Sequence, residues 1–72
     1  MQFPNKDQIE KIRQEYPVGT KVRLIEMSDK QAPPLGTIGV VQFVDDIGSI
    51  HTHWENGSGL AFIPEIDMVQ KL

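Results

Sequence analysis

Residues 36–64 read GTIGVVQFVDDIGSIHTHWENGSGLAFIP, and this stretch decides the fold. It contains three strand-like runs, at residues 40–44, 49–54 and 59–63. The Asp-Asp-Ile-Gly sequence at 45–48 favours a turn, because Asp bonds to nearby backbone and Gly accepts a positive φ. Asn-Gly at 56–57 is typical of a tight hairpin. The stretch therefore predicts a three-stranded antiparallel meander that ends at Pro64, which cannot donate a ladder hydrogen bond.

The second run alternates with a period of two, which is the pattern of a half-buried strand. Ile50 and Trp54 fall on one face, and His51 and His53 fall on the other. We expect Ile50 and Trp54 in the core and both histidines outside. Gly39 is expected to allow tight bending or close packing of its strand.

The residues before the meander predict a helix and a first strand. Asn5 is a good N-cap for a helix over residues 5–16, and Gln8 completes a capping box. A strand over 18–27 places Val22 and Leu24 inside and Lys21 and Arg23 outside, and its alternation then breaks, which predicts a bulge. Ile9, Ile12 and Tyr16 form one apolar stripe on the helix, and we expect Ile25 and Met27 to meet its Ile9 and Ile12.

The remaining segments complete a small barrel. A Pro-rich loop over 28–35 joins the first strand to the meander, and a turn over 64–67 leads to a last strand over 68–72. Five strands in this order predict a mainly β, SH3-like barrel over residues 18–72 with one short N-terminal α-helix. From the length of 72 residues we expect a single domain.

Composition limits the function classes. The chain has no cysteine, which excludes disulfides and thiolate zinc sites. It has no apolar run near the ~18 residues of a membrane helix and no signal peptide, so we expect a cytoplasmic location. Residues 31–72 carry one basic and five acidic residues, against six and five in residues 1–30. An acidic meander disfavours nucleic acid, because it repels phosphates.

No residue pattern indicates catalysis, a cofactor or a metal centre. His51 and His53 share one strand face, but a zinc site would also need ligands from Glu55 or Asp46. Solvent-exposed histidines are the favoured interpretation. Asp45 and Asp46 are expected to form a turn, not an acid–base pair. We therefore expect a non-enzymatic protein without a cofactor.

Two surfaces are candidates for binding. Ile38, Val40 and Phe43 form a candidate partner-binding set, because Ile38 and Val40 face outward if Val41 and Val44 face the core. This stripe contacts either the N-terminal helix or an unidentified protein, in a monomer or a weak dimer. The alternative is nucleic-acid binding through Lys21, Arg23, Lys30 and the 28–35 loop. A third hypothesis is a structural subunit or small inhibitor.

Two further features concern grooves. Trp54 favours the core, but an aromatic residue at this place can also line a ligand groove. Tyr16, Phe43 and the loop prolines are an alternative groove for proline-rich peptides.

The segments GTKVRLIEM (19–27) and LGTIGVVQFVDDIGSIHTHWENGSGLAFIP (35–64) carry two resemblances. Over residues 16–67 the chain resembles an uncharacterised family of small SH3-like proteins from Gram-positive bacteria and their phages or mobile elements. That resemblance implies a fold and no site residues. Gly19–Leu24 and the pattern Gly36-x-x-Gly39-x-Val41-x-x-Val44-Asp45 are also similar to the KOW motif of ribosomal and transcription-elongation proteins. This resemblance implies binding of RNA or protein through a barrel face.

Overall fold

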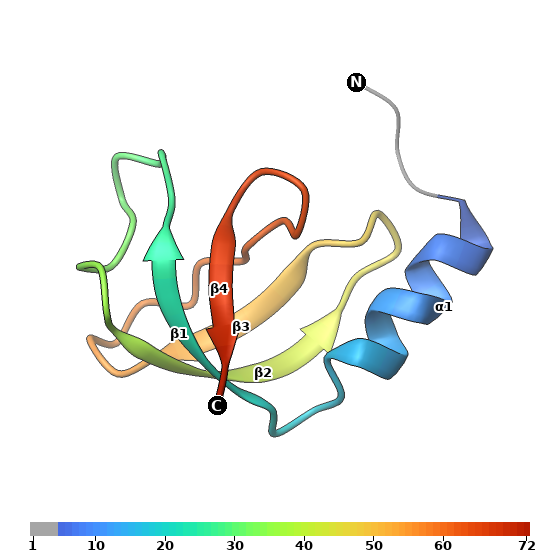
Figure 1. Cartoon of the computed structure of the whole chain (residues 1–72), viewed down its shortest axis with the longest axis horizontal. Helices are drawn as coiled ribbons and strands as arrows, with labels where there is room; N and C mark the ends of the chain where they lie inside the picture. Colours follow the sequence, from blue (N-terminus) through green and yellow to red (C-terminus); the bar gives the residue numbers. More distant parts are fainter. Residues whose placement is uncertain (1–4) are drawn as a thin grey trace.

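The computed structural model describes residues 5–72 and shows a mainly β domain with one helix (Figure 1). Four antiparallel strands form one sheet in the order β3-β2-β1-β4, and the sheet does not close on itself. The elements, in chain order, are α1 (Lys6–Glu15), β1 (Lys21–Glu26), β2 (Ile38–Val44), β3 (Ile50–Trp54) and β4 (Met68–Lys71). No helix within residues 5–72 is long and apolar enough to cross a bilayer.

The expectation of five strands is wrong, because residues 59–63 do not form a strand. Phe62 makes an isolated bridge with Ile50, through two backbone hydrogen bonds of 2.9 and 3.0 Å. The backbone of Leu60, two residues before Phe62, bonds to side chains and does not continue the pairing with β3. The Trp54 indole donates to the Leu60 carbonyl at 2.8 Å, and the Ser58 hydroxyl accepts from the Leu60 N–H at 3.2 Å. The predicted closed barrel is accordingly replaced by an open four-stranded sheet.

The concave side of the sheet holds the core. Its fully buried side chains come from all three long strands and from Phe62. Ile50 and Trp54 are buried as the alternation predicts, while His53 is exposed. The register shifts between Val41 and Phe43, which lets both Val41 and Val44 face inward. The core residues are Val22, Leu24, Val41, Val44, Ile50, Thr52, Trp54 and Phe62.

The helix begins as predicted but packs on a different strand. Asn5 accepts the Gln8 N–H while the Gln8 side chain accepts the Asn5 N–H, both at 2.9 Å, so the capping box is complete. Ile9 is buried, and α1 packs against β2, with no comparable packing on β1. The expected contact of the helix with Ile25 is therefore wrong, because Ile25 is 40% exposed on a strand that α1 does not contact. Met27 packs against the same core cluster as Ile12. The bulge expected in this strand is present, between Leu24 and Glu26.

The end of the chain returns to the end of the helix. The predicted turn at 64–67 is present, and the predicted last strand is β4, which pairs with β1. Lys71 Nζ donates to the Glu15 carbonyl at 2.6 Å and lies 5.1 Å from the centre of the Tyr16 ring. Tyr16 in turn packs edge-to-face on Phe62, with ring centres 5.5 Å apart. These contacts join β4, the helix terminus and the core.

Candidate interaction face on the convex side of the sheet

The convex side of the sheet brings together residues that the sequence separates. Lys21 lies directly opposite Val40, and Arg23 lies directly opposite Ile38. Val40 has His53 on its other side, and Arg23 has Gln70 on its other side. Because side chains of directly paired residues point to the same face of a sheet, all six share one surface. We call this set the outer face: Lys21, Arg23, Ile38, Val40, His53 and Gln70.

The centre of the outer face is apolar and partly open to solvent. Ile38 and Val40 are half-buried, while their core neighbours Gly39 and Val41 are buried. The helix does not cover this side, because Ile12 and Tyr16 pack against the core cluster on the opposite side. The orientation expected for Ile38 and Val40 is thus present, and helix docking does not account for it.

The two cations on the outer face have no acidic partner among residues 5–72. Arg23 donates to the Gln70 side chain at 3.4 Å, and Lys21 makes no ion pair in the described part of the chain. Gln70 is a member that sequence reasoning missed, since only the β1–β4 register places it beside Arg23. The face therefore offers aliphatic surface flanked by two available positive charges.

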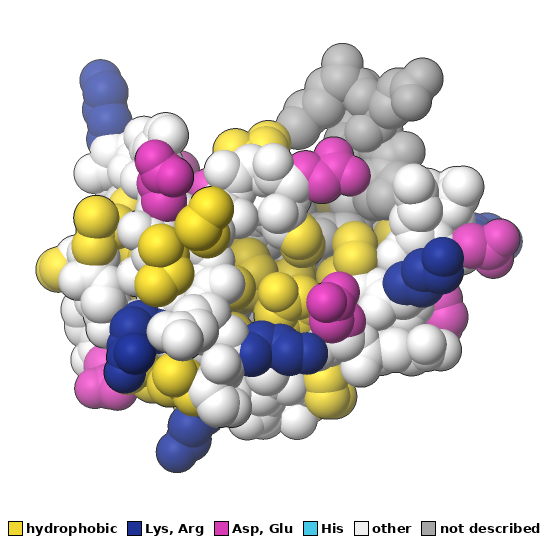
Figure 2. Space-filling view, viewed as in Figure 1, with side chains coloured by type: hydrophobic (Ala, Val, Ile, Leu, Met, Phe, Trp, Pro, Cys, Tyr) yellow, Lys and Arg dark blue, Asp and Glu magenta, His cyan; other side chains and the backbone are white. Residues whose placement is uncertain are grey.

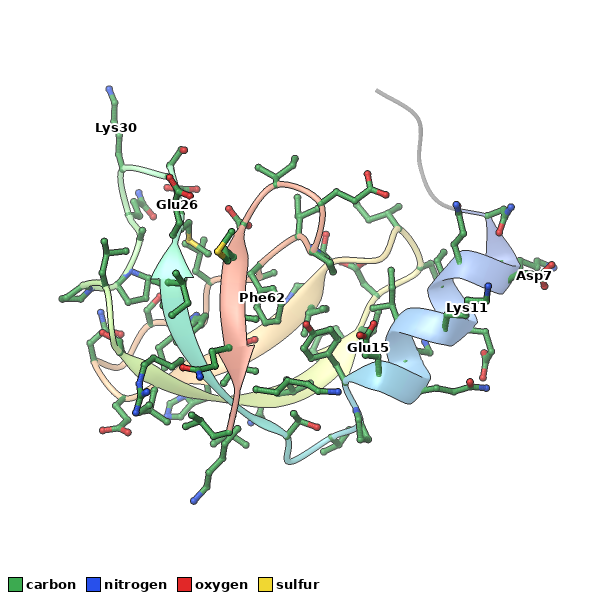
Figure 3. All side chains as sticks on the ribbon, in the orientation of Figure 1. Asp7, Lys11, Glu15, Glu26, Lys30 and Phe62 are labelled. Carbon is green, nitrogen blue, oxygen red and sulfur yellow. The ribbon has the colours of Figure 1, made fainter. Side chains whose placement is uncertain are left out.

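Lys30 does not join Lys21 and Arg23. It lies in the loop beyond the end of β1, and its side chain extends away from the sheet (Figure 3). The nucleic-acid set expected from the sequence is therefore divided, with two of its three cations on the sheet and one on the loop. A phosphate backbone bound on the sheet would meet only Lys21 and Arg23.

Phe43 lies beyond the bulge, at the end of β2, and is 53% exposed. Its ring stacks on the His51 imidazole, with centroids 4.3 Å apart and planes 10° apart. His51 Nε2 lies 2.8 Å from Asp45 Oδ2, so the His51 ring is held by Asp45 at its edge and by Phe43 at its face. Phe43 extends the apolar surface towards the β2–β3 turn.

Asp45 organises that turn, as expected from the sequence. Its Oδ1 accepts the N–H groups of Ser49 at 2.9 Å and Ile47 at 3.1 Å, while its Oδ2 faces His51. Partial burial raises the pKa of Asp45, but the hydrogen bonds from His51, Ser49 and Ile47 outweigh it and hold the pKa below its usual value. Asp46 points elsewhere and pairs with Arg13 at 3.3 Å.

The two histidines lie in different surroundings on β3. His51 is held by Asp45 and Phe43, and His53 is exposed on the next outward position of β3. Residues 5–72 contain no group of three or more His, Cys, Asp or Glu residues that could hold an ion. Among the described residues, the acids of the meander lie in turns and at strand ends, not on the outer face.

Tyr16 and Phe43 line a shallow apolar hollow of about 230 Å³. The other lining residues are Arg13, Pro17, Val18 and Val44. The prolines of the 28–35 loop take no part in it, so the groove expected from Tyr16, Phe43 and those prolines is not formed as predicted. Trp54 is fully buried and lines neither this hollow nor the outer face.

Comparison with known proteins gives one assignment. No curated protein and no solved structure matches the chain. The family model described as "Domain of unknown function (DUF4314)" matches residues 5–72, which include the helix and all four strands. The chain therefore belongs to the DUF4314 family.

Proposed function

We propose that this chain is a non-enzymatic interaction module that binds a protein partner through the outer face. The observation that carries the proposal is the β1–β2 register, which places Arg23 beside Ile38 and Lys21 beside Val40. An apolar strip with charges at its border suits a protein segment, since apolar contact supplies affinity and charge supplies orientation.

The chemistry of the face specifies the partner segment. The aliphatic stems of Lys21 and Arg23 extend the apolar strip of Ile38 and Val40, while their charged ends remain in water. A partner that presents an aliphatic or aromatic side chain with a neighbouring carboxylate would satisfy both features. Phe43 is the further apolar contact at the edge of this surface.

We further propose an SH3-like relationship for the fold. The strand order β3-β2-β1-β4 supports it, because the Phe62 segment lies on the free side of β3, in the place of an additional strand. A cytoplasmic location agrees with the lack of cysteine. An origin in Gram-positive bacteria or their mobile elements rests on the sequence resemblance alone.

KOW-type nucleic-acid binding is the second candidate, favoured by the two cations that share the outer face. Two phosphate contacts predict weak binding that falls steeply with salt. Protein binding through an apolar centre predicts little dependence on salt. The acidic net charge of −3 also favours the protein partner.

Site-specific photo-crosslinking tests the proposal. A photoreactive phenylalanine analogue replaces Val40 on the outer face, and a matched protein carries it at Leu35, an exposed apolar residue in the loop. We expect a discrete crosslinked protein from position 40 that is absent from position 35 and is lost in the Ile38→Asp variant. Equal crosslinking from both positions would contradict the proposal.

A titration of the labelled protein with single-stranded RNA and duplex DNA at low salt tests the second candidate. Amide shifts at Lys21 and Arg23 that vanish as salt is added would replace protein binding by nucleic-acid binding. An unchanged spectrum would exclude the nucleic-acid candidate.

A further inference from the structure

A second surface lies at the opposite side of the sheet, between β4 and the end of α1. A hollow of about 230 Å³ opens there, and Figure 2 shows hydrophobic side chains exposed in the depression between these elements. The aromatic residues Tyr16 and Phe62 line the hollow, and Val69 lines it from β4. In Figure 3 Phe62 is labelled beside β4, on the side that faces α1. The hollow therefore joins the core aromatics to an edge of the sheet.

The strand beside the hollow has one unpaired edge. β4 is the last strand of the sheet and pairs only with β1 in the described part of the chain. The Leu72 N–H donates to the Lys21 carbonyl, so the backbone groups of Gln70 also face β1. By alternation, the N–H and C=O groups of Val69 and Lys71 face the free edge. An extended chain laid along β4 would find these groups available.

Exposed apolar side chains accompany that edge. Ile66, in the turn before β4, is 58% exposed, and Met68, the first residue of β4, is 55% exposed. Both line the hollow, together with Pro64. The partner is therefore expected to carry apolar side chains next to the residue that enters the hollow.

The charged residues that line the hollow are all acidic, and the cation beside it is Lys71, which lies over the Tyr16 ring and bonds to the Glu15 carbonyl. The lining includes Glu26, Glu65 and Asp67 and no basic residue. None of these acids forms an ion pair within residues 5–72, although Asp67 accepts the Ile63 N–H at 2.8 Å. Glu26 and Glu65 are exposed and lie on either side of the β4 start, in β1 and in the turn. A cationic side chain matches this rim, with its aliphatic stem against the aromatic and aliphatic lining.

We propose that the β4 edge and this hollow bind an extended segment of another protein that carries an arginine or lysine between two apolar residues. The segment adds to β4 as a further strand, and its backbone bonds to Val69 and Lys71. Its cationic side chain enters the hollow towards Glu26 and Glu65, and its apolar neighbours cover Met68 and Ile66. This surface is distinct from the outer face.

Peptide titration of the labelled chain tests the inference. The probe is the blocked pentapeptide acetyl-Thr-Val-Arg-Val-Thr-amide, compared with the same peptide carrying norleucine or glutamate at its centre. We expect amide shifts at Met68, Val69 and Lys71 with the arginine peptide, and slower hydrogen exchange of the Val69 and Lys71 N–H groups. The norleucine peptide binds more weakly, and the glutamate peptide does not bind.

Charge variants of the chain supply the control. The Glu26→Gln/Glu65→Gln double variant is expected to weaken the arginine peptide about fivefold. The Glu10→Gln/Glu55→Gln double variant, which changes two exposed acids outside the hollow, leaves binding unchanged. Equal loss in both double variants would overturn the proposal, because net charge alone would explain the binding.

Three other results would also overturn it. The first is an arginine peptide that shifts no amide at millimolar concentration, and the second is a peptide that shifts the outer-face residues Arg23 and Val40 instead of β4. Concentration-dependent shifts of Val69 and Lys71 without peptide would assign the edge to a second copy of this chain. Each result is independent of the crosslinking at Val40, so the two surfaces are tested separately.

Discussion

Gly39 of β2 lies directly opposite Trp54 of β3, and the indole occupies the space where a side chain on Gly39 would stand. A Cβ at this position would lie 2.6 Å from both Trp54 Cε3 and Thr52 Cγ2. Both neighbours are fully buried, so neither can move freely. The close packing expected for this glycine is therefore present, and it is caused by Thr52 together with Trp54, the only tryptophan of the chain.

We predict that Gly39→Ala lowers the free energy of unfolding by about 1–3 kcal/mol, because it overpacks the core. Urea denaturation followed by Trp54 fluorescence measures the change. Gly59→Ala is the control, since a Cβ there meets nothing within 4 Å. We expect less than about 0.5 kcal/mol for the control. An unchanged free energy of unfolding for Gly39→Ala would contradict the prediction and would show that β2 and β3 can move apart to make room for the methyl group.

The docking of the helix predicts opposite results for two isoleucines. Ile9→Thr removes a buried contact between α1 and the sheet and is expected to cost about 2 kcal/mol. Ile25→Thr, on a strand that the helix does not contact, is expected to cost less than about 0.5 kcal/mol. Thermal unfolding of both variants compares them directly. A larger loss of stability for Ile25→Thr than for Ile9→Thr would contradict this docking and would support packing of α1 on the end of β1.

The capping box gives a third prediction. Asn5 has the extended backbone of an N-cap, with φ −78° and ψ 175°, and exchanges two hydrogen bonds with Gln8. Asn5→Ala is expected to cost about 1 kcal/mol. Gln14→Ala, at an exposed position inside the helix, should change stability little. Circular dichroism at 222 nm during urea denaturation reports both. Equal effects would mean that the box does not hold the helix start.

Asp45 gives the pH dependence. A carboxyl group with a lowered pKa in the folded state contributes stability above its unfolded pKa, and this is lost as pH falls through the folded pKa. Asp45→Asn keeps the shape but removes the charge, and is expected to cost about 1 kcal/mol at pH 7. The difference between wild type and variant should shrink as the pH falls below about 3.9.

Urea denaturation at several pH values between neutral and acid follows this change. Asp46→Asn is the matched control, because Asp46 is exposed and holds only the surface pair with Arg13. A difference between Asp45→Asn and wild type that stays constant with pH would show that the Asp45 charge does not contribute.

Local patterns in the sequence predict most of the elements correctly. The alternation from Ile50 to Trp54 gives the buried face of β3, and Asn5 with Gln8 gives the start of α1. The strand predicted over residues 59–63 does not form, because the side chains of Trp54 and Ser58 bond to the Leu60 backbone groups that a strand would have paired. Those bonds depend on the folded position of the indole, and hydrophobic periodicity does not report them.

The grouping of residues on the proposed binding surfaces shows the same limit. Sequence reasoning places Lys21 and Arg23 in one hypothesis and Ile38 and Val40 in another, because each set lies on its own strand. The register unites them on one face, and register is fixed by pairing across the 28–37 connection. Lys30 shows the converse, since it is near Arg23 in sequence but lies away from the sheet. Sequence proximity therefore predicted the strand residues but not their grouping.

The attachment of α1 has a consequence for cooperativity. The helix contributes one buried residue, Ile9, while Ile12 and Tyr16 pack partly buried against the core of the sheet, and single hydrogen bonds from Arg13 to the Val44 carbonyl and from Lys71 to the Glu15 carbonyl hold its second half. Such an element is expected to open as a separate unit at a free-energy cost below that of global unfolding. Amide hydrogens of α1 would then exchange with solvent through this partial opening, whereas those of β2 and β3 would exchange only when the whole chain unfolds.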